Sequence, residues 1–249
     1  MIEFELEHWS AWAPGLETRE SWLAWARAPR IGATDGAPEV RFIPAMTRRR
    51  LSRIAKMVAQ VAHDCSSADE LRERPLVFAS RHCEIGTSTL ILRDIAANLP
   101  LSPTAFSHSV HNAPVGQLSI LAQNRRPSVS VSARQATFAM GWLEALSVSR
   151  RCNGSAVLYV YADEPLPVEY RAFADEPDFT CATALVVRAA RGAADASFTL
   201  RWSRAEPSPR APDQLPDPLA TVAWLCSRGA QLDLAAAAGW GWRVEHRGR

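Results

Sequence analysis

The chain lacks several features that would place it in a specialised class of protein. It contains no run of 18 uncharged apolar residues, so we expect no membrane span. Its first residues, "MIEFELEHWS", are acidic where a secretory signal needs a basic region followed by an apolar run. A net charge of +2 with scattered arginines does not indicate a nucleic-acid-binding surface. We therefore expect a cytoplasmic protein that binds no nucleic acid.

Metal-binding and disulfide motifs are also missing. The five cysteines are odd in number, widely spaced and without a C-x-x-C pair, which argues against a disulfide framework and a zinc site. His108 and His111 could be metal ligands, but no third ligand has suitable spacing. We expect reduced thiols, no metal and no cofactor.

What is present indicates a layered α/β fold. Strands are predicted at residues 2–12, 75–80, 129–132, 156–162, 180–189 and 196–203. Helices are predicted at 18–27, 47–65, 87–98, 115–123, 135–149 and 218–227, with Thr47 as the N-cap of the second. Residues 99–114 form an irregular connection in this prediction. Alternating strands and helices are typical of α/β domains.

Composition also suggests a domain division. Residues 206–217 are rich in Pro, Ser and Asp and are predicted to be a linker. We expect one domain over residues 1–205, followed by the linker. Residues 218–249 would then form a helix and a Trp- and Arg-rich tail that packs on the same domain.

One set of residues has the spacing of a known catalytic turn. In chain order the set contains Ser102-Pro103, Asn112, Gly116, Pro127, the strand "SVSVS" and Gln135. This order resembles the β-ketoacyl synthase family of the thiolase-like fold, with Gln135 in the place of the nucleophilic cysteine. The stretches "PLVFASRHCEIGTS", "AVLYVYADEPLP" and "FTCATALVVRA" resemble the family as well, so the resemblance spans residues 51–190. It implies a thiolase-like α/β/α fold, essentially the N-terminal half of a ketosynthase with a truncated second half.

The chemistry of that family needs three residues. A helix N-terminus lowers the pKa of the cysteine thiol, and two histidines from the second half bind the thioester carbonyl. Here the amide of Gln135 cannot form a thioester, and the only later histidine is His246 in the charged tail. We therefore expect no catalytic residue in this chain.

Glutamine occupies this position in two branches of the family. One comprises chain length factors, the inactive partners of ketosynthases, and the other comprises loading-module decarboxylases, which keep both histidines. The resemblance thus implies a non-catalytic, chain-length-factor-like subunit, similar to the ketosynthase-like proteins of bacterial aryl polyene clusters. The alternative is a stand-alone malonyl decarboxylase or acyl-transfer enzyme.

A chain length factor has two partners, by resemblance: a full-length β-ketoacyl-ACP synthase, as a heterodimer, and an acyl carrier protein. The strand carrying Val129 and Val131 would pair across the dimer axis. The loop at 103–114 would reach the partner's acyl tunnel. Its candidate tunnel and interface residues are Phe106, His108, Val110, His111 and Asn112.

Three further features have a functional and a structural interpretation. Phe138 either plugs an acyl cavity or fills the core. Arg48, Arg49, Arg50 and Arg53 either contact an acidic carrier protein or form a solvated helix start. Cys83, between His82 and Glu84, is either a nucleophile or a structural thiol, and adjacent side chains usually point apart, which favours the structural interpretation.

Overall fold

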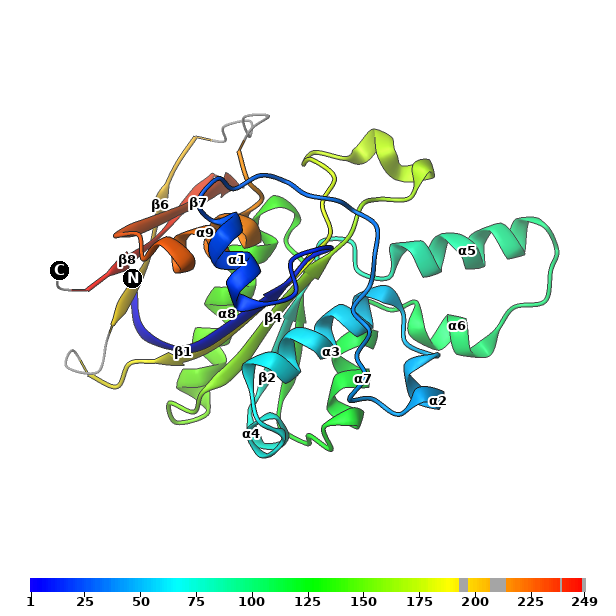
Figure 1. Ribbon diagram of the computed structural model, residues 1–249, viewed down its shortest axis with the longest axis horizontal. Coiled ribbons are helices and arrows are strands. Elements are labelled where there is room, and N and C mark those ends of the chain that lie inside the picture. The colour runs from blue at the N-terminus through cyan, green and yellow to red at the C-terminus, as the bar shows by residue number, and fades with distance from the viewer. Residues whose placement is uncertain (193–196, 207–213, 238, 248–249) are drawn as a thin grey trace.

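The computed structural model describes residues 1–192, 197–206, 214–237 and 239–247 (Figure 1). Most of the predicted linker, residues 207–213, lies outside this part of the chain. The described strands are β1 (Ile2–Trp12), β2 (Leu76–Ala79), β3 (Ser128–Val131), β4 (Val157–Asp163), β5 (Cys181–Ala189), β6 (Phe198–Arg204), β7 (Gln231–Ala237) and β8 (Trp240–His246). The described helices are α1 (Arg19–Trp25), α2 (Ala45–Arg48), α3 (Arg53–Cys65), α4 (Ala68–Glu73), α5 (Ile85–Ala96), α6 (Pro103–His108), α7 (Ala113–Leu121), α8 (Thr137–Arg151) and α9 (Asp217–Ser227), with 3-10 turns η1 (Arg134–Ala136) and η2 (Val168–Phe173).

The described strands form a single mixed sheet in the order β3-β2-β4-β5-β1-β6-β8-β7. Strand β2 runs parallel to both β3 and β4, while β5, β1, β6, β8 and β7 pair antiparallel with their neighbours. The two edges of the sheet are β3 and β7. The turn that holds Gln135 therefore follows an edge strand.

Alternating side chains of the central strands build two hydrophobic layers. Strand β4 directs Val157, Tyr159 and Tyr161 into the layer that contains α8 and α9. Its other face carries Leu158 and Val160, which pack with α3 and α7. Because side chains of a strand alternate between the two faces, an apolar run such as "VLYVYA" fits a strand covered on both sides. The predicted layered α/β fold is confirmed.

The helix predicted at 47–65 is wrong at its start. The structure places a short helix, α2, at Ala45–Arg48 and begins α3 only at Arg53. Ser52 is the N-cap of α3, because its hydroxyl accepts a hydrogen bond from the amide of Ala55 at 3.0 Å. Thr47 lies inside α2 and caps nothing.

A helical arm projects from the sheet; in chain order it follows β2 and precedes β3. We call α5 and α6, with the connection at 97–102, the arm; Figure 1 shows it extending away from the rest of the molecule. The predicted irregular connection is wrong here, because α6 occupies Pro103–His108. Ser102 accepts a hydrogen bond from the amide of Ala105, and Pro103 stands at the first helical position.

The C-terminal segment continues the sheet. Strands β7 and β8 form an antiparallel hairpin, and β8 pairs with β6. Trp242 and Val244 alternate with exposed Arg243 and point into the core. No secondary structure was predicted for this tail from the sequence, so neither strand was expected. Within the described residues, each helix is too short or too polar to cross a bilayer.

Candidate functional site

The turn between β3 and α8 is built from local hydrogen bonds. The amide of Ala133 donates to the hydroxyl of Thr137 at 2.9 Å, and this hydroxyl donates to the carbonyl of Arg134 at 2.6 Å. Arg134 has φ of +53°, a left-handed conformation that side chains other than glycine adopt at a cost. Gln135 follows it in η1 and is exposed, directly before the N-terminus of α8.

The side chain of Gln135 is engaged by a carboxylate. Its Nε2 donates a hydrogen bond to Oδ2 of Asp175 at 2.8 Å. The other oxygen of Asp175 pairs with Arg81, whose Nη1 also contacts Oε2 of Glu176 at 2.6 Å. The Arg81 side chain is only 7% exposed, so the two carboxylates neutralise a nearly buried cation.

Charges and burial act against one another in this cluster. Burial alone would raise the pKa of Asp175, but the hydrogen bond and the charge of Arg81 outweigh it and hold that pKa below its ordinary value. Burial would likewise lower the pKa of Arg81, and the neighbouring Glu176 and Asp175 raise it instead. Both groups are therefore ionised at neutral pH.

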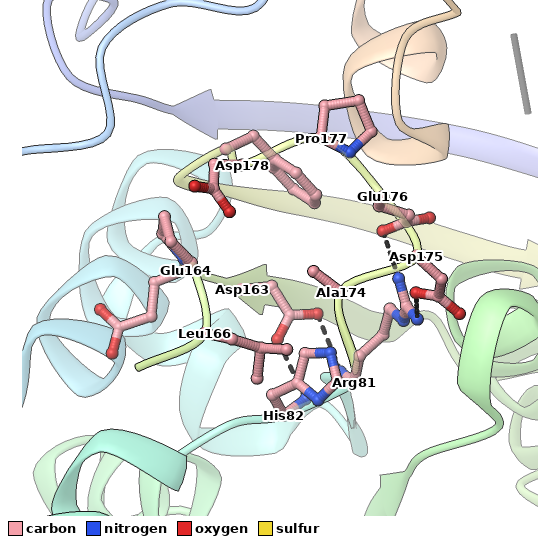
Figure 2. A pocket seen from close by; sticks show the side chains of 12 residues that line it. Arg81, His82, Asp163, Glu164, Leu166, Ala174, Asp175, Glu176, Pro177 and Asp178 are labelled. Atoms are coloured by element: carbon pink, nitrogen blue, oxygen red, sulfur yellow. Dashed lines mark hydrogen bonds and ion pairs between the residues drawn. The ribbon is translucent and has the colours of Figure 1, made fainter. Parts of the chain in front are cut away.

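A small cavity lies beside this cluster, between Arg81, His82 and the residues that follow β4 (Figure 2). Its volume is about 30 Å³, which has room for water but not for an acyl chain. The buried carboxylate of Asp163 accepts hydrogen bonds from the Ser80 hydroxyl at 2.7 Å and from the amides of Arg81 and His82 at 2.8 and 3.2 Å. Asp163 thus fixes the turn that follows β2.

Cys83 is part of that turn and has a structural position. It is buried, and its thiol contacts the carbonyl of His111 at 3.3 Å. Burial raises the pKa of the Cys83 thiol, which disfavours the reactive thiolate. Burial also lowers the pKa of His82, so this imidazole is less often charged than a free one. The geometry therefore favours the structural interpretation of Cys83.

The predicted tunnel residues separate into two groups. Phe106 and Val110 are 64% and 49% exposed, and Asn112 is exposed as well, while His108 is half-buried. His111 is turned inward: its Nε2 lies 2.8 Å from the carbonyl oxygen of Ser80, and its ring contacts Phe78. His111 therefore does not extend toward a partner in this conformation.

Phe138 lies in an aromatic cluster within the core. It is 2% exposed, with its ring centroid 6.0 Å from Trp142, 5.6 Å from Tyr159 and 5.4 Å from Tyr161. The hydroxyl of Tyr159 donates to the carbonyl of Phe138 at 2.8 Å. These contacts favour core packing over a cavity plug.

The remaining predicted positions lie on two surfaces. Val129 and Val131 are half-buried on the edge strand β3. Arg49 and Arg50 are exposed and Arg48 is half-buried. Arg53 differs from them, because it pairs with Glu164 and donates to the carbonyl of Thr34 at 3.0 Å. Of the four arginines predicted to contact a carrier protein, Arg53 is thus the one engaged by internal partners.

His246 is remote from the nucleophile turn. It lies in β8, where its ring contacts Phe198 and Trp224. Strand β8 is five strands from β2 in the sheet, which corresponds to about 24 Å at a spacing of about 4.8 Å. His246 therefore cannot assist chemistry at Gln135 in this fold.

A family model agrees with this geometry. The model described as beta-ketoacyl synthase, N-terminal domain, matches residues 22–243. The chain therefore belongs to the β-ketoacyl synthase family, as the sequence motifs predicted. No curated protein sequence matches the chain at a significant level.

Solved structures place the chain within the family more narrowly. A chain in the complex of a ketosynthase (ApeO) with its chain length factor (ApeC) from Xenorhabdus doucetiae has a TM-score of 0.83 and 26% identity, over 98% of this chain and 100% of that one. The ishigamide ketosynthase/chain length factor has a TM-score of 0.73 and 12% identity, over 98% and 99%. The complex AntDE:AntF, a type II ketosynthase with its acyl-carrier protein, has a TM-score of 0.67 and 10% identity, over 100% of both chains. The last two similarities concern the fold alone.

Proposed function

We propose that the chain is a non-catalytic, chain-length-factor-like partner of an active β-ketoacyl-ACP synthase, and that it shapes the acyl tunnel during elongation of a polyene or fatty-acid-like chain. The observation that carries this proposal is the nucleophile turn. Its backbone is built as a strand-to-helix turn, yet its exposed side chain is an amide bound to Asp175. A subunit of this kind contributes surface and shape, not a nucleophile.

The apolar surface of the arm supports a partner subunit. Leu90, Leu92, Ile95 and Leu99 are 58%, 54%, 52% and 54% exposed. With Phe106 and Val110, they leave apolar side chains uncovered on both helices of the arm. Exposed apolar surface of this extent is typical of protein interfaces.

The edge strand β3 supports the same partner. It pairs with β2 on one side only, so its other side has free backbone groups that a second chain can bind. Val129 and Val131 are the half-buried side chains along this edge. A heterodimer that covers both β3 and the arm would bury on the order of 2,000–5,000 Å², the range of obligate interfaces.

The partner is a full-length ketosynthase, by analogy with the ApeO–ApeC complex that the chain resembles along its whole length. We place the pair in the cytoplasm, in a pathway of the aryl polyene type.

The acyl carrier protein is acidic, and we assign its contact on this subunit to Arg48, Arg49 and Arg50. For these three side chains the structure gives no ion pair within the described residues, so their charge is free to bind it. We also retain the division into a domain at 1–205, a linker at 206–217 and a C-terminal segment at 218–249 as part of the proposal.

Three observations weigh against the alternative, a stand-alone malonyl decarboxylase or acyl-transfer enzyme. The amide of Gln135 is already occupied by Asp175, and the small cavity nearby has no room for an acyl thioester. His246, the only histidine that follows Gln135, is on a distant strand.

Co-expression with a full-length Cys-His-His β-ketoacyl-ACP synthase tests the proposal. We expect one heterodimer on size-exclusion chromatography and condensation of malonyl-carrier substrates only by the pair. Phe106→Asp should weaken the complex at least about tenfold, because it places a charge in an apolar interface. Leu23→Asp is the matched control, since Leu23 is an exposed apolar residue on α1 at 43%. Condensation or decarboxylation by the chain alone, or an absence of binding to the ketosynthase, would refute the proposal.

A further inference from the structure

The connection from β4 to β5 contacts the nucleophile turn through Asp175. We call residues 164–178 the strap; η2 occupies its middle. The strap contributes carboxylates, and other parts of the fold contribute the arginines that bind them. The pairs are Glu164 with Arg53 of α3, Glu169 with Arg93 of α5, and Asp175 and Glu176 with Arg81. The strap is therefore held by complementary charge against three separate elements.

One of these pairs joins the strap to the arm. Nε of Arg93 donates to Oε1 of Glu169 at 2.7 Å. Arg93 is three residues after Leu90, so both side chains are on the same face of α5. Val168 precedes Glu169 and is 70% exposed, and Phe173, at the other end of η2, is 73% exposed. The ion pair thus joins the strap to the arm, and both segments carry exposed apolar side chains.

Gln135 is the neutral member of this set of contacts. Asp175 has two carboxylate oxygens: Oδ1 is bound by Arg81, and Oδ2 is bound by the amide of Gln135 at 2.8 Å. Figure 2 shows Arg81 directed at both Asp175 and Glu176, whereas Glu164 points away from them. An amide nitrogen can donate to the remaining oxygen, whereas alanine cannot and glutamate would repel it.

We propose that Gln135 is a positioning residue: its amide fixes the strap, so that Val168 and Phe173 extend the arm into one apolar surface for the ketosynthase partner. The docking half of this inference rests on the proposed function, and the positioning half does not. The partner we assign is the ketosynthase because the Arg93–Glu169 pair holds the strap against the arm, whose apolar surface we assign to that subunit.

The positioning half is tested on the full-length chain by hydrogen–deuterium exchange of residues 164–178. Gln135→Ala and the isosteric Gln135→Glu should increase exchange about two- to tenfold, the range of one net hydrogen bond, with Glu the stronger. Gln135→Lys keeps a donor and should retain slow exchange. Gln60→Ala is the matched control, because Gln60 makes the same amide-to-aspartate contact with Asp64, at 2.9 Å, on α3. If the Gln135 side chain only filled space, the exchange rates of the three variants would not depend on whether the new side chain can donate a hydrogen bond. Wild-type exchange in all three variants would overturn the assignment.

The docking half is tested by the affinity for the ketosynthase. Val168→Asp and Phe173→Asp should each weaken binding at least about tenfold, and Gln135→Glu should weaken it by less than either. Wild-type affinity in both aspartate variants would overturn the docking role, even if hydrogen–deuterium exchange supports the role of Gln135 in fixing the strap. If the wild-type chain does not bind a ketosynthase at all, the proposed function fails, whereas the exchange experiment still decides the role of Gln135.

Discussion

Truncating Phe138 to alanine should destabilise the fold, whereas truncating Phe106 should leave it intact. Both aromatic residues were candidates for limiting the length of an acyl chain. The structure separates them, because Phe138 is 2% exposed among three aromatic rings and Phe106 is 64% exposed on α6. The same substitution therefore removes core packing in one case and surface in the other.

The magnitudes follow from burial. A buried Phe→Ala change costs about 3–5 kcal/mol, because it combines lost transfer energy with a residual cavity. In a chain of this size about 1 kcal/mol shifts Tm by about 2–4 °C, so Phe138→Ala should lower Tm by about 6–20 °C. An exposed substitution stays within about 0.5 kcal/mol, so Phe106→Ala should change Tm by about 2 °C at most.

Urea and thermal unfolding of both variants measure these effects. Mass spectrometry of carrier-bound products from the reconstituted heterodimer gives the second measurement. If Phe106 limits the tunnel, removing it relieves an overpacking cost of about 1–3 kcal/mol per added two-carbon unit, which shifts the product distribution toward longer chains about tenfold. Wild-type stability of Phe138→Ala together with longer products would refute the reasoning, because the ring would then border the tunnel.

Three further outcomes are expected. Gly141→Ala should destabilise the chain by about 1–3 kcal/mol in urea unfolding, because a Cβ there would lie 2.7 Å from both Ala79 and Tyr159 in the α8 packing; a stability gain would contradict it. Burial is the main reason that the pKa of Glu84 is raised in the folded state. A carboxyl of this kind contributes stability that is fully present below its unfolded-state pKa. That contribution is lost as the pH rises through its folded-state pKa. The stability of Glu84→Gln relative to wild type should therefore increase as pH rises above about 4.3. Glu17→Gln is the matched surface variant, because Glu17 is exposed, and a flat pH profile for Glu84→Gln would exclude this origin. Gln135→Cys should give no condensation or decarboxylation by the chain alone, and turnover of malonyl-carrier substrate by this variant would sink the non-catalytic assignment.

Local patterns predicted the fold where burial is continuous. The apolar run of β4 and the alternation of apolar and polar residues in β1 are both typical of a strand. Both strands lie where they were predicted. The missed elements had short-range signals that went unused. Ser102-Pro103 is a helix start, "SADE" at the start of α4 is a capping box, and Trp242 and Val244 alternate as a strand requires.

The site was predicted only in part, for a physical reason. The family spacing identified Gln135, but no local pattern pointed to its partner, because Asp175 is 40 residues away and Arg81 is 94 residues from Asp175. Contacts of this range depend on strand order, which local periodicity does not determine. The partner of Arg53 was not foreseen for the same reason, since Glu164 is 111 residues away.

The amide at position 135 and the acidic strap are consistent with each other on electrostatic grounds. A nucleophilic cysteine must be a thiolate, and a helix N-terminus favours it. Here the same turn contacts Asp175 at 2.8 Å, and Arg81 pairs with the carboxylates of both Asp175 and Glu176. The carboxylate of Asp175 would raise the pKa of a thiol at this position and oppose the effect of the helix. An amide carries no charge and can donate to Asp175, so glutamine suits this environment and cysteine does not. The strap that this turn binds is thus incompatible with the chemistry that the turn serves in active ketosynthases.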